Sequence, residues 1–147
     1  MNDQSTMKDE RKLLAVFETM QDAVRAKDID TIISLYSQDI RAFDAVSQLQ
    51  FNGVKSYRKH WEECMANCQG ESFFDIHELQ IEPVSELAYS HFLIHCGGTN
   101  EEGVKQSAWM RGTVCCRKFN GEWQITHEHY SVPFDLKTGT TLFDLKP

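Results

Sequence analysis

The chain lacks several features that would assign it at once to a membrane or nucleic-acid-binding class. No apolar run approaches the roughly 20 residues that a membrane-spanning helix needs, and the polar start MNDQSTMKDERK has no apolar stretch typical of a secretory signal. Positive charge is also scarce, because 15 Lys and Arg stand against 22 Asp and Glu, for a net charge of −7. We therefore expect a cytoplasmic protein that binds neither nucleic acid nor anionic membranes.

Motifs for cofactors and disulfides are missing as well. The sequence contains no GxGxxG, P-loop, GxSxG or HExxH pattern, and we expect no bound cofactor. The five cysteines are odd in number, and their spacing fits neither a disulfide scaffold nor a zinc finger. Cys64 and Cys68 lie four residues apart on an expected helix, where reduced cysteine acts as a small apolar side chain.

What is present fits one globular domain. A length of 147 residues is common for a single domain, and 41% hydrophobic with 25% charged residues is ordinary for a folded protein. There is no repeat, low-complexity segment or linker. We therefore expect residues 1–147 to form one domain, with a core over about 8–135 and a C-terminal tail at 136–147.

The first half of the chain predicts helices. Apolar residues at helical spacing predict a helix over 8–27, and Asp28 is placed to cap a second, short helix. Residues 39–46 predict a first strand. A turn at Asn52-Gly53 then introduces a third helix over 54–68.

From residue 72 onward, strand-like runs separated by turn residues predict an antiparallel meander. The Asn120-Gly121 pair between the last two runs is the strongest short hairpin signal in the chain. Helices followed by such a sheet predict an α+β fold in which the helices cover one sheet face.

The last hairpin gives a more detailed expectation. If its loop is only Asn120-Gly121, alternation along the strands decides which side chains share a face. One face would carry Arg111 opposite Tyr130 and Thr113 opposite Glu128. The other would carry His127 and His129 with Met110, Gly112, Val114 and Cys116. A β-bulge would shift the register by one residue and exchange the faces.

Two segments resemble members of the nuclear transport factor 2-like superfamily. DIDTIISLYSQDIRAFD resembles the second helix and first strand of many members. GEWQITHEHYSVP resembles the closing strand of SnoaL-like proteins and of the calcium/calmodulin-dependent protein kinase II association domain. The likeness covers about residues 10–135 and implies a cystatin-like fold, with helices packed on a strongly curved, mainly antiparallel sheet that forms a cone-shaped pocket. The superfamily includes isomerases, cyclases, dehydratases and association modules, so it does not imply one reaction.

The resemblance also implies candidate site residues. Asp44 matches the general base of ketosteroid isomerase. The oxyanion-hole donors of that enzyme fall at Met20 and near Cys115, which cannot donate useful hydrogen bonds, so we reject its mechanism. The small-carboxylate pocket of the kinase association domain matches Tyr57, His91, Arg111 and Tyr130.

The first functional hypothesis is a small-molecule pocket between the third helix and the sheet. Asp44 would act as base or acceptor, with Arg111 and Tyr130 stabilising negative charge. The reaction would be isomerisation, cyclisation or dehydration of a small carbonyl compound without a cofactor. The walls and proton-transfer groups would come from Tyr57, Trp61, Thr113, His91 and Glu128. The alternative is that Asp44 and Arg111 form an internal ion pair and nothing more.

Two other hypotheses remain open. His127 and His129 would lie on one side of a strand at a spacing that suits zinc or iron, although no third ligand is evident. Alternatively, the domain only associates, or senses a ligand without turnover. A homodimer, or a higher oligomer, is expected because relatives commonly pair through the sheet. An apolar patch at Met110, Val114, Cys116 and Ile125 would support it.

Overall fold

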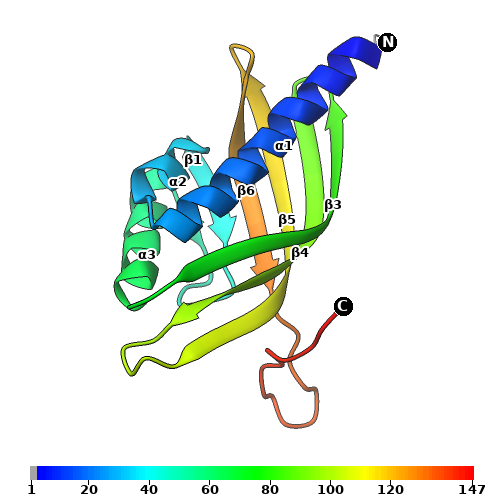
Figure 1. Ribbon diagram of the computed structural model, residues 1–147. Coiled ribbons are helices and arrows are strands. Elements are labelled where there is room, and N and C mark those ends of the chain that lie inside the picture. The colour runs from blue at the N-terminus through cyan, green and yellow to red at the C-terminus, as the bar shows by residue number, and fades with distance from the viewer. Residues whose placement is uncertain (1–2) are drawn as a thin grey trace.

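The computed structural model describes residues 3–147, in which helices pack on one side of a bent sheet (Figure 1). The helices are α1 (Asp3–Ala26), α2 (Ile29–Ser34) and α3 (Val54–Ala66). The long helix α1 buries an apolar stripe at helical spacing, made of Leu13, Val16, Phe17, Met20, Ala23 and Val24. Asp28 caps α2 as predicted, because its carboxylate accepts a hydrogen bond from the Thr31 backbone N–H at 3.2 Å.

The sheet has six strands in the order β2-β1-β6-β5-β4-β3. They are β1 (Tyr36–Phe43), β2 (Phe51–Asn52), β3 (Ser72–Val84), β4 (Leu87–Thr99), β5 (Lys105–Phe119) and β6 (Glu122–Ser131). The β1–β6 pair is parallel and the other neighbours are antiparallel. The predicted α+β fold with a mainly antiparallel sheet is therefore confirmed. No helix within residues 3–147 is long and apolar enough to cross a membrane.

The first strand begins earlier than predicted. It spans 36–43 rather than 39–46, because α2 ends at Ser34 and Leu35 forms its C-cap. Tyr36 therefore starts the strand, and its side chain is buried. Asp44 follows the strand in a turn, where its Oδ1 accepts a hydrogen bond from the Val46 backbone N–H at 3.2 Å.

The long strands β3 and β4 bend strongly around α1 (Figure 1). The β3–β4 register shifts between His77 and Gln80, and Glu78 has a φ of +55° at that point. A bulge of this kind bends a strand and increases its twist. The bend gives the sheet a concave face, which packs on the helices, and a convex face that the helices of residues 3–147 leave uncovered.

A second bulge corrects the predicted register of the last hairpin. Asn120 (φ +50°) and Gly121 (φ +79°) form the expected two-residue loop, and Phe119 pairs with Glu122. Cys116 still pairs with Ile125, but Cys115 pairs with His127, so Thr126 is an extra residue. Beyond it, Tyr130 lies opposite Gly112 and Arg111 lies opposite Ser131. The predicted pairing of Arg111 with Tyr130, and of Thr113 with Glu128, is therefore wrong.

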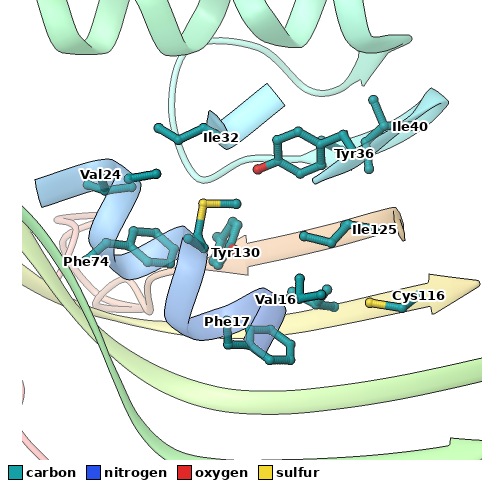
Figure 2. Packing of buried hydrophobic residues seen from close by; sticks show 14 of the residues in the cluster. Val16, Phe17, Val24, Ile32, Tyr36, Ile40, Phe74, Cys116, Ile125 and Tyr130 are labelled. Atoms are coloured by element: carbon teal, nitrogen blue, oxygen red, sulfur yellow. The ribbon is translucent and has the colours of Figure 1, made fainter. Parts of the chain in front are cut away.

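The face assignments change accordingly. Glu128 and Tyr130 lie on the concave face and are buried, whereas Arg111, Thr113, His127 and His129 lie on the convex face. Cys116 and Ile125 belong to the same buried cluster as Val16 and Phe17 of α1 (Figure 2). The predicted association patch is thus part of the hydrophobic core, since Val114, Cys116 and Ile125 are all buried and Met110 packs against them.

Replacement of Gly112 tests this register. A Cβ at that position would lie 2.6 Å from Phe92 Cε2 and 3.0 Å from Tyr130 Cε1. We expect Gly112→Ala to reduce the free energy of unfolding by about 1–3 kcal/mol, because the crowded ring atoms belong to a packed core. Chemical denaturation measures the change. Thr113→Val is the control at the neighbouring exposed position, and an equal loss in both variants would contradict the register.

Candidate functional site

The carboxyl group of Glu128 lies at the centre of a buried polar cluster on the concave face. The residue is 0% exposed. Its Oε2 accepts a hydrogen bond from the Tyr36 hydroxyl at 2.9 Å and lies 2.5 Å from the Tyr57 hydroxyl oxygen. Its Oε1 has no hydrogen-bond partner. A buried polar atom without a partner is costly, so Oε1 marks a place where a further polar atom would be stabilised.

Asp44 adjoins this cluster through Tyr57. Its Oδ2 lies 3.1 Å from the Tyr57 hydroxyl and 3.3 Å from Nε2 of His60, whose side chain is only 4% exposed. The same Nε2 lies 3.7 Å from Sγ of Cys64. One tyrosine hydroxyl therefore connects two carboxyl groups, one fully buried and one close to the surface.

Helix α3 positions the two central side chains. Tyr57 and His60 are three residues apart, which places them on the same helix face. Their rings are stacked, with centroids 5.8 Å apart and planes within 7°. Phe51 packs against both rings at 5.4 and 4.4 Å. Gly53 (φ +87°) is the N-cap of α3 and directly follows β2. Because a single residue connects β2 to α3, the helix stays close to the neighbouring strand β1.

The environment shifts the pKa values of the cluster. Burial raises the pKa of Glu128 to about 7; hydrogen bonds from Tyr57 and Tyr36 oppose the shift, and the charge of Asp44 adds to it. Burial by itself would lower the pKa of His60, but the contacts with Asp44 and Cys64 raise it to about 10. At neutral pH, His60 is thus a cation beside Asp44, while Glu128 is close to its midpoint.

The structure brings together only part of the predicted site. Asp44, Tyr57, Glu128 and Tyr130 meet on the concave face, and the Tyr130 hydroxyl helps to stabilise the ionised form of Glu128. Trp61 is half-buried beside them, packed edge-on against Tyr57, and its Nε1 has no hydrogen-bond partner.

The remaining predicted residues lie on the convex face. His91, Arg111 and Thr113 line a shallow depression of about 430 Å³ together with Glu78 and Gln80. Arg111 donates a hydrogen bond from Nε to Ser131 Oγ at 3.1 Å. The proposed internal pair of Asp44 and Arg111 does not form, because Asp44 pairs with His60 and Arg111 belongs to the other sheet face.

His127 and His129 also lie on the convex face, beside Phe43. Their ring centroids are 6.5 Å apart, and Nδ1 of His127 lies 2.6 Å from the Arg41 carbonyl oxygen. Within residues 3–147, no group of three or more His, Cys, Asp or Glu side chains is placed to hold a metal ion. The third ligand that this hypothesis requires is not supplied by the described chain.

Two site residues were not predicted from the sequence. Tyr36 opens β1, three residues before the predicted start of that strand. His60 carried a usable signal, because it lies three residues after Tyr57 on the same predicted helix. Its role depends on Asp44, which is distant in sequence and meets it only in the folded chain.

Three helices on the concave side of a curved, mainly antiparallel sheet define a nuclear transport factor 2-like fold. The chain belongs to the SnoaL-like domain family, whose family model matches residues 13–135. An NTF2-like protein of unknown function from Pseudomonas putida is 42% identical, covering 96% of this chain and 98% of that chain with a TM-score of 0.88.

More distant structures share the fold alone. A candidate calcium/calmodulin-dependent protein kinase II association domain from Xanthomonas campestris is 20% identical, covering 82% of this chain and 85% of that chain with a TM-score of 0.73. A candidate dehydratase of the NTF2-like family from Streptomyces avermitilis is 15% identical, covering 84% and 95% with a TM-score of 0.74. No match is found among curated proteins.

The raised pKa of Glu128 predicts a specific pH dependence of stability. The folded carboxyl binds its proton up to about pH 7, whereas its ordinary pKa is 4.5. Folding therefore gains stability from this group at low pH and loses it as the pH rises through 7. We expect the stability difference between wild type and Glu128→Gln to fall by roughly 2–3 kcal/mol between about pH 5 and pH 8.

Chemical denaturation across this pH range measures the difference. Glu122→Gln is the control, since Glu122 lies on the same strand and its side chain is 82% exposed. A stability difference that stays constant with pH would show that Glu128 is ionised in the folded protein throughout the range.

Proposed function

We propose that this domain binds a small molecule at the concave carboxyl cluster and performs acid–base chemistry on it without a cofactor. The observation that carries the proposal is the fully buried carboxyl of Glu128, whose Oε1 has no partner. A second carboxyl group, Asp44, lies one hydroxyl away in a more exposed environment. Two carboxyl groups with different environments are suited to separate acid and base roles.

The proposed reaction is the isomerisation, cyclisation or dehydration of a small carbonyl compound. Asp44 would remove a proton, with its orientation fixed by His60 and Tyr57. The hydrogen-bond donors of Tyr130 and Trp61 would stabilise the negative charge that develops on the substrate, a role expected of Arg111 from the sequence. These two residues lie beside Glu128 and Tyr57, whereas Arg111 lies on the convex face. Aromatic rings would form the walls of the site.

Fold relatives support this chemistry as a class. The Streptomyces avermitilis neighbour is described as a candidate dehydratase, and a neighbour from Novosphingobium aromaticivorans as a candidate aromatic ring hydroxylase. Both are 15% identical to this chain. They support a small-molecule role on this fold, and the buried cluster supports acid–base chemistry in particular.

Native mass spectrometry of the purified protein, before and after mild denaturation, tests the proposal. We expect release of a small carbonyl or hydroxy compound. With that compound as substrate, Asp44→Asn should lower kcat by about 10²-fold or more, because a positioned base is lost. Arg111→Ala is the matched control and should leave kcat unchanged. Equal activity of wild type and Asp44→Asn would refute the assignment of the base.

The convex face favours a second function, self-association into a homodimer. It is a sheet face that the helices leave uncovered, and it carries aromatic and imidazole groups. Trp109 stacks on His95, with centroids 4.8 Å apart and planes within 13°, and Phe73 and His77 extend this cluster. Tyr89 on the same face is 51% exposed. Aromatic groups are enriched at the centres of protein interfaces, so a second copy of the chain is a suitable occupant.

A charge placed in the middle of this face tests the dimer. Leu93 lies on the convex face of β4 between His91 and His95. We expect Leu93→Lys to weaken self-association about ten-fold or more, since it would bury a second positive charge directly opposite Arg111. Analytical ultracentrifugation measures the change. Leu14→Lys on the outer side of α1, where the residue is 43% exposed, is the control. A monomeric wild type would refute the proposal.

A further inference from the structure

The three oxygen contacts that join Tyr36, Glu128, Tyr57 and Asp44 require one more proton than Tyr36 and Tyr57 provide. Glu128 Oε2 lies 2.9 Å from the Tyr36 hydroxyl oxygen and 2.5 Å from that of Tyr57, which in turn lies 3.1 Å from Asp44 Oδ2. Each hydroxyl group has a single proton to donate. If both carboxyl groups were ionised, one of these contacts would bring two electron-rich oxygens together with no hydrogen between them.

A proton on Oε2 of Glu128 completes all three contacts. The carboxylic O–H then donates to the Tyr57 oxygen, the Tyr57 O–H donates to Asp44, and the Tyr36 O–H donates to Oε2. Asp44 remains ionised in this arrangement, because Nε2 of His60 lies 3.3 Å from the same carboxylate. Burial points the same way, since Glu128 is 0% exposed and the Asp44 side chain is 16% exposed. The charge is therefore less costly on Asp44.

We propose that Asp44, Tyr57 and Glu128 form a relay that holds one proton, with Asp44 as the base and Glu128 as the acid, whose Oε2 carries the proton and whose Oε1 accepts a hydrogen bond from the ligand. The ligand side of this assignment rests on the proposed function, whereas the shared proton rests on the oxygen contacts alone. Tyr57 has a positioning and relay role, because it touches both carboxyl groups.

The same geometry defines the class of ligand. No lysine or arginine among residues 3–147 pairs with Asp44 or Glu128, and the one nearby cation, His60, is paired with Asp44. An anionic ligand would therefore find no unpaired cation beside the described carboxyl groups. The unpartnered Oε1 of Glu128 and Nε1 of Trp61 suit a neutral molecule with oxygen atoms. A neutral β-hydroxy carbonyl compound has this chemistry.

Dehydration of such a compound balances within the relay. Asp44 takes the proton from the carbon next to the carbonyl, and the electrons of that C–H bond form the new C=C bond. The C–O bond breaks, and the Oε2–H of Glu128 turns from the Tyr57 oxygen to the departing oxygen, which takes this proton and leaves as water. Asp44 is then protonated and Glu128 ionised. Transfer from Asp44 to the Tyr57 oxygen, and from the Tyr57 O–H to Glu128, restores the starting state without another reactant.

Infrared titration of the ligand-free protein tests the shared proton. We expect a carboxylic C=O band that loses its intensity with a midpoint near pH 7, the pKa of Glu128. Glu128→Gln should abolish the band, and the exposed-site control Glu122→Gln should leave it unchanged. Asp44→Asn should lower the midpoint, because the charge of Asp44 raises the pKa of Glu128.

The outcomes separate the two proposals. Absence of the carboxylic band at all pH values between about 5 and 9 would overturn the relay. Persistence of the band in Glu128→Gln would also overturn it, because the proton would then belong to another group, such as Asp44. The band requires no ligand, so failure to find a substrate would count against the proposed function and leave the relay standing. With a substrate in hand, Glu128→Gln should reduce kcat more strongly than it raises KM, because the acid acts in the bond-breaking step.

Discussion

The enclosure of the Glu128 carboxyl group is the constraint on which both layers of the molecule depend. Tyr36 reaches it from β1 and Tyr57 from α3, while Tyr130 lies two residues further along β6. A carboxyl group removed from water must keep its hydrogen bonds. Helix α3 therefore cannot separate from the sheet without removing the Tyr57 hydroxyl from that group, and with it the contact that connects Glu128 to Asp44.

The bulge at Thr126 makes this enclosure possible. By adding one residue to β6, it turns Glu128 and Tyr130 toward the helices and sends His127 and His129 to the convex face. Gly112 then allows the rings of Phe92 and Tyr130 to approach the β5 backbone, where a larger residue would collide with them. A single extra residue thus decides which titratable groups enter the core.

The two faces of the sheet consequently have separate chemistry. The concave face holds the buried carboxyl cluster beneath the helices, and the convex face holds aromatic rings, imidazoles and Arg111. Association through one face would leave the other available for a ligand.

Local features of the sequence were enough to determine the α1 stripe, the Asp28 cap, the Asn120-Gly121 loop and the order of the helices before the long antiparallel strands. Each depends on residues close together in the chain, as helix periodicity and turn chemistry do. Asp44 and Tyr57 were also identified as site residues, with the help of family resemblance. The position of β1 was missed by a few residues, because the end of α2 depends on how Tyr36 packs in the core.

The tertiary structure alone decided the register after Thr126, and with it the composition of the site. Nothing in the local sequence distinguishes the bulged register from the regular one, since both place a plausible set of side chains on each face. The choice depends on which register gives Glu128 its contacts with Tyr36 and Tyr57, two residues that are distant in the chain. The pairing of His60 with Asp44 has the same origin, because only the folded chain brings α3 to the end of β1.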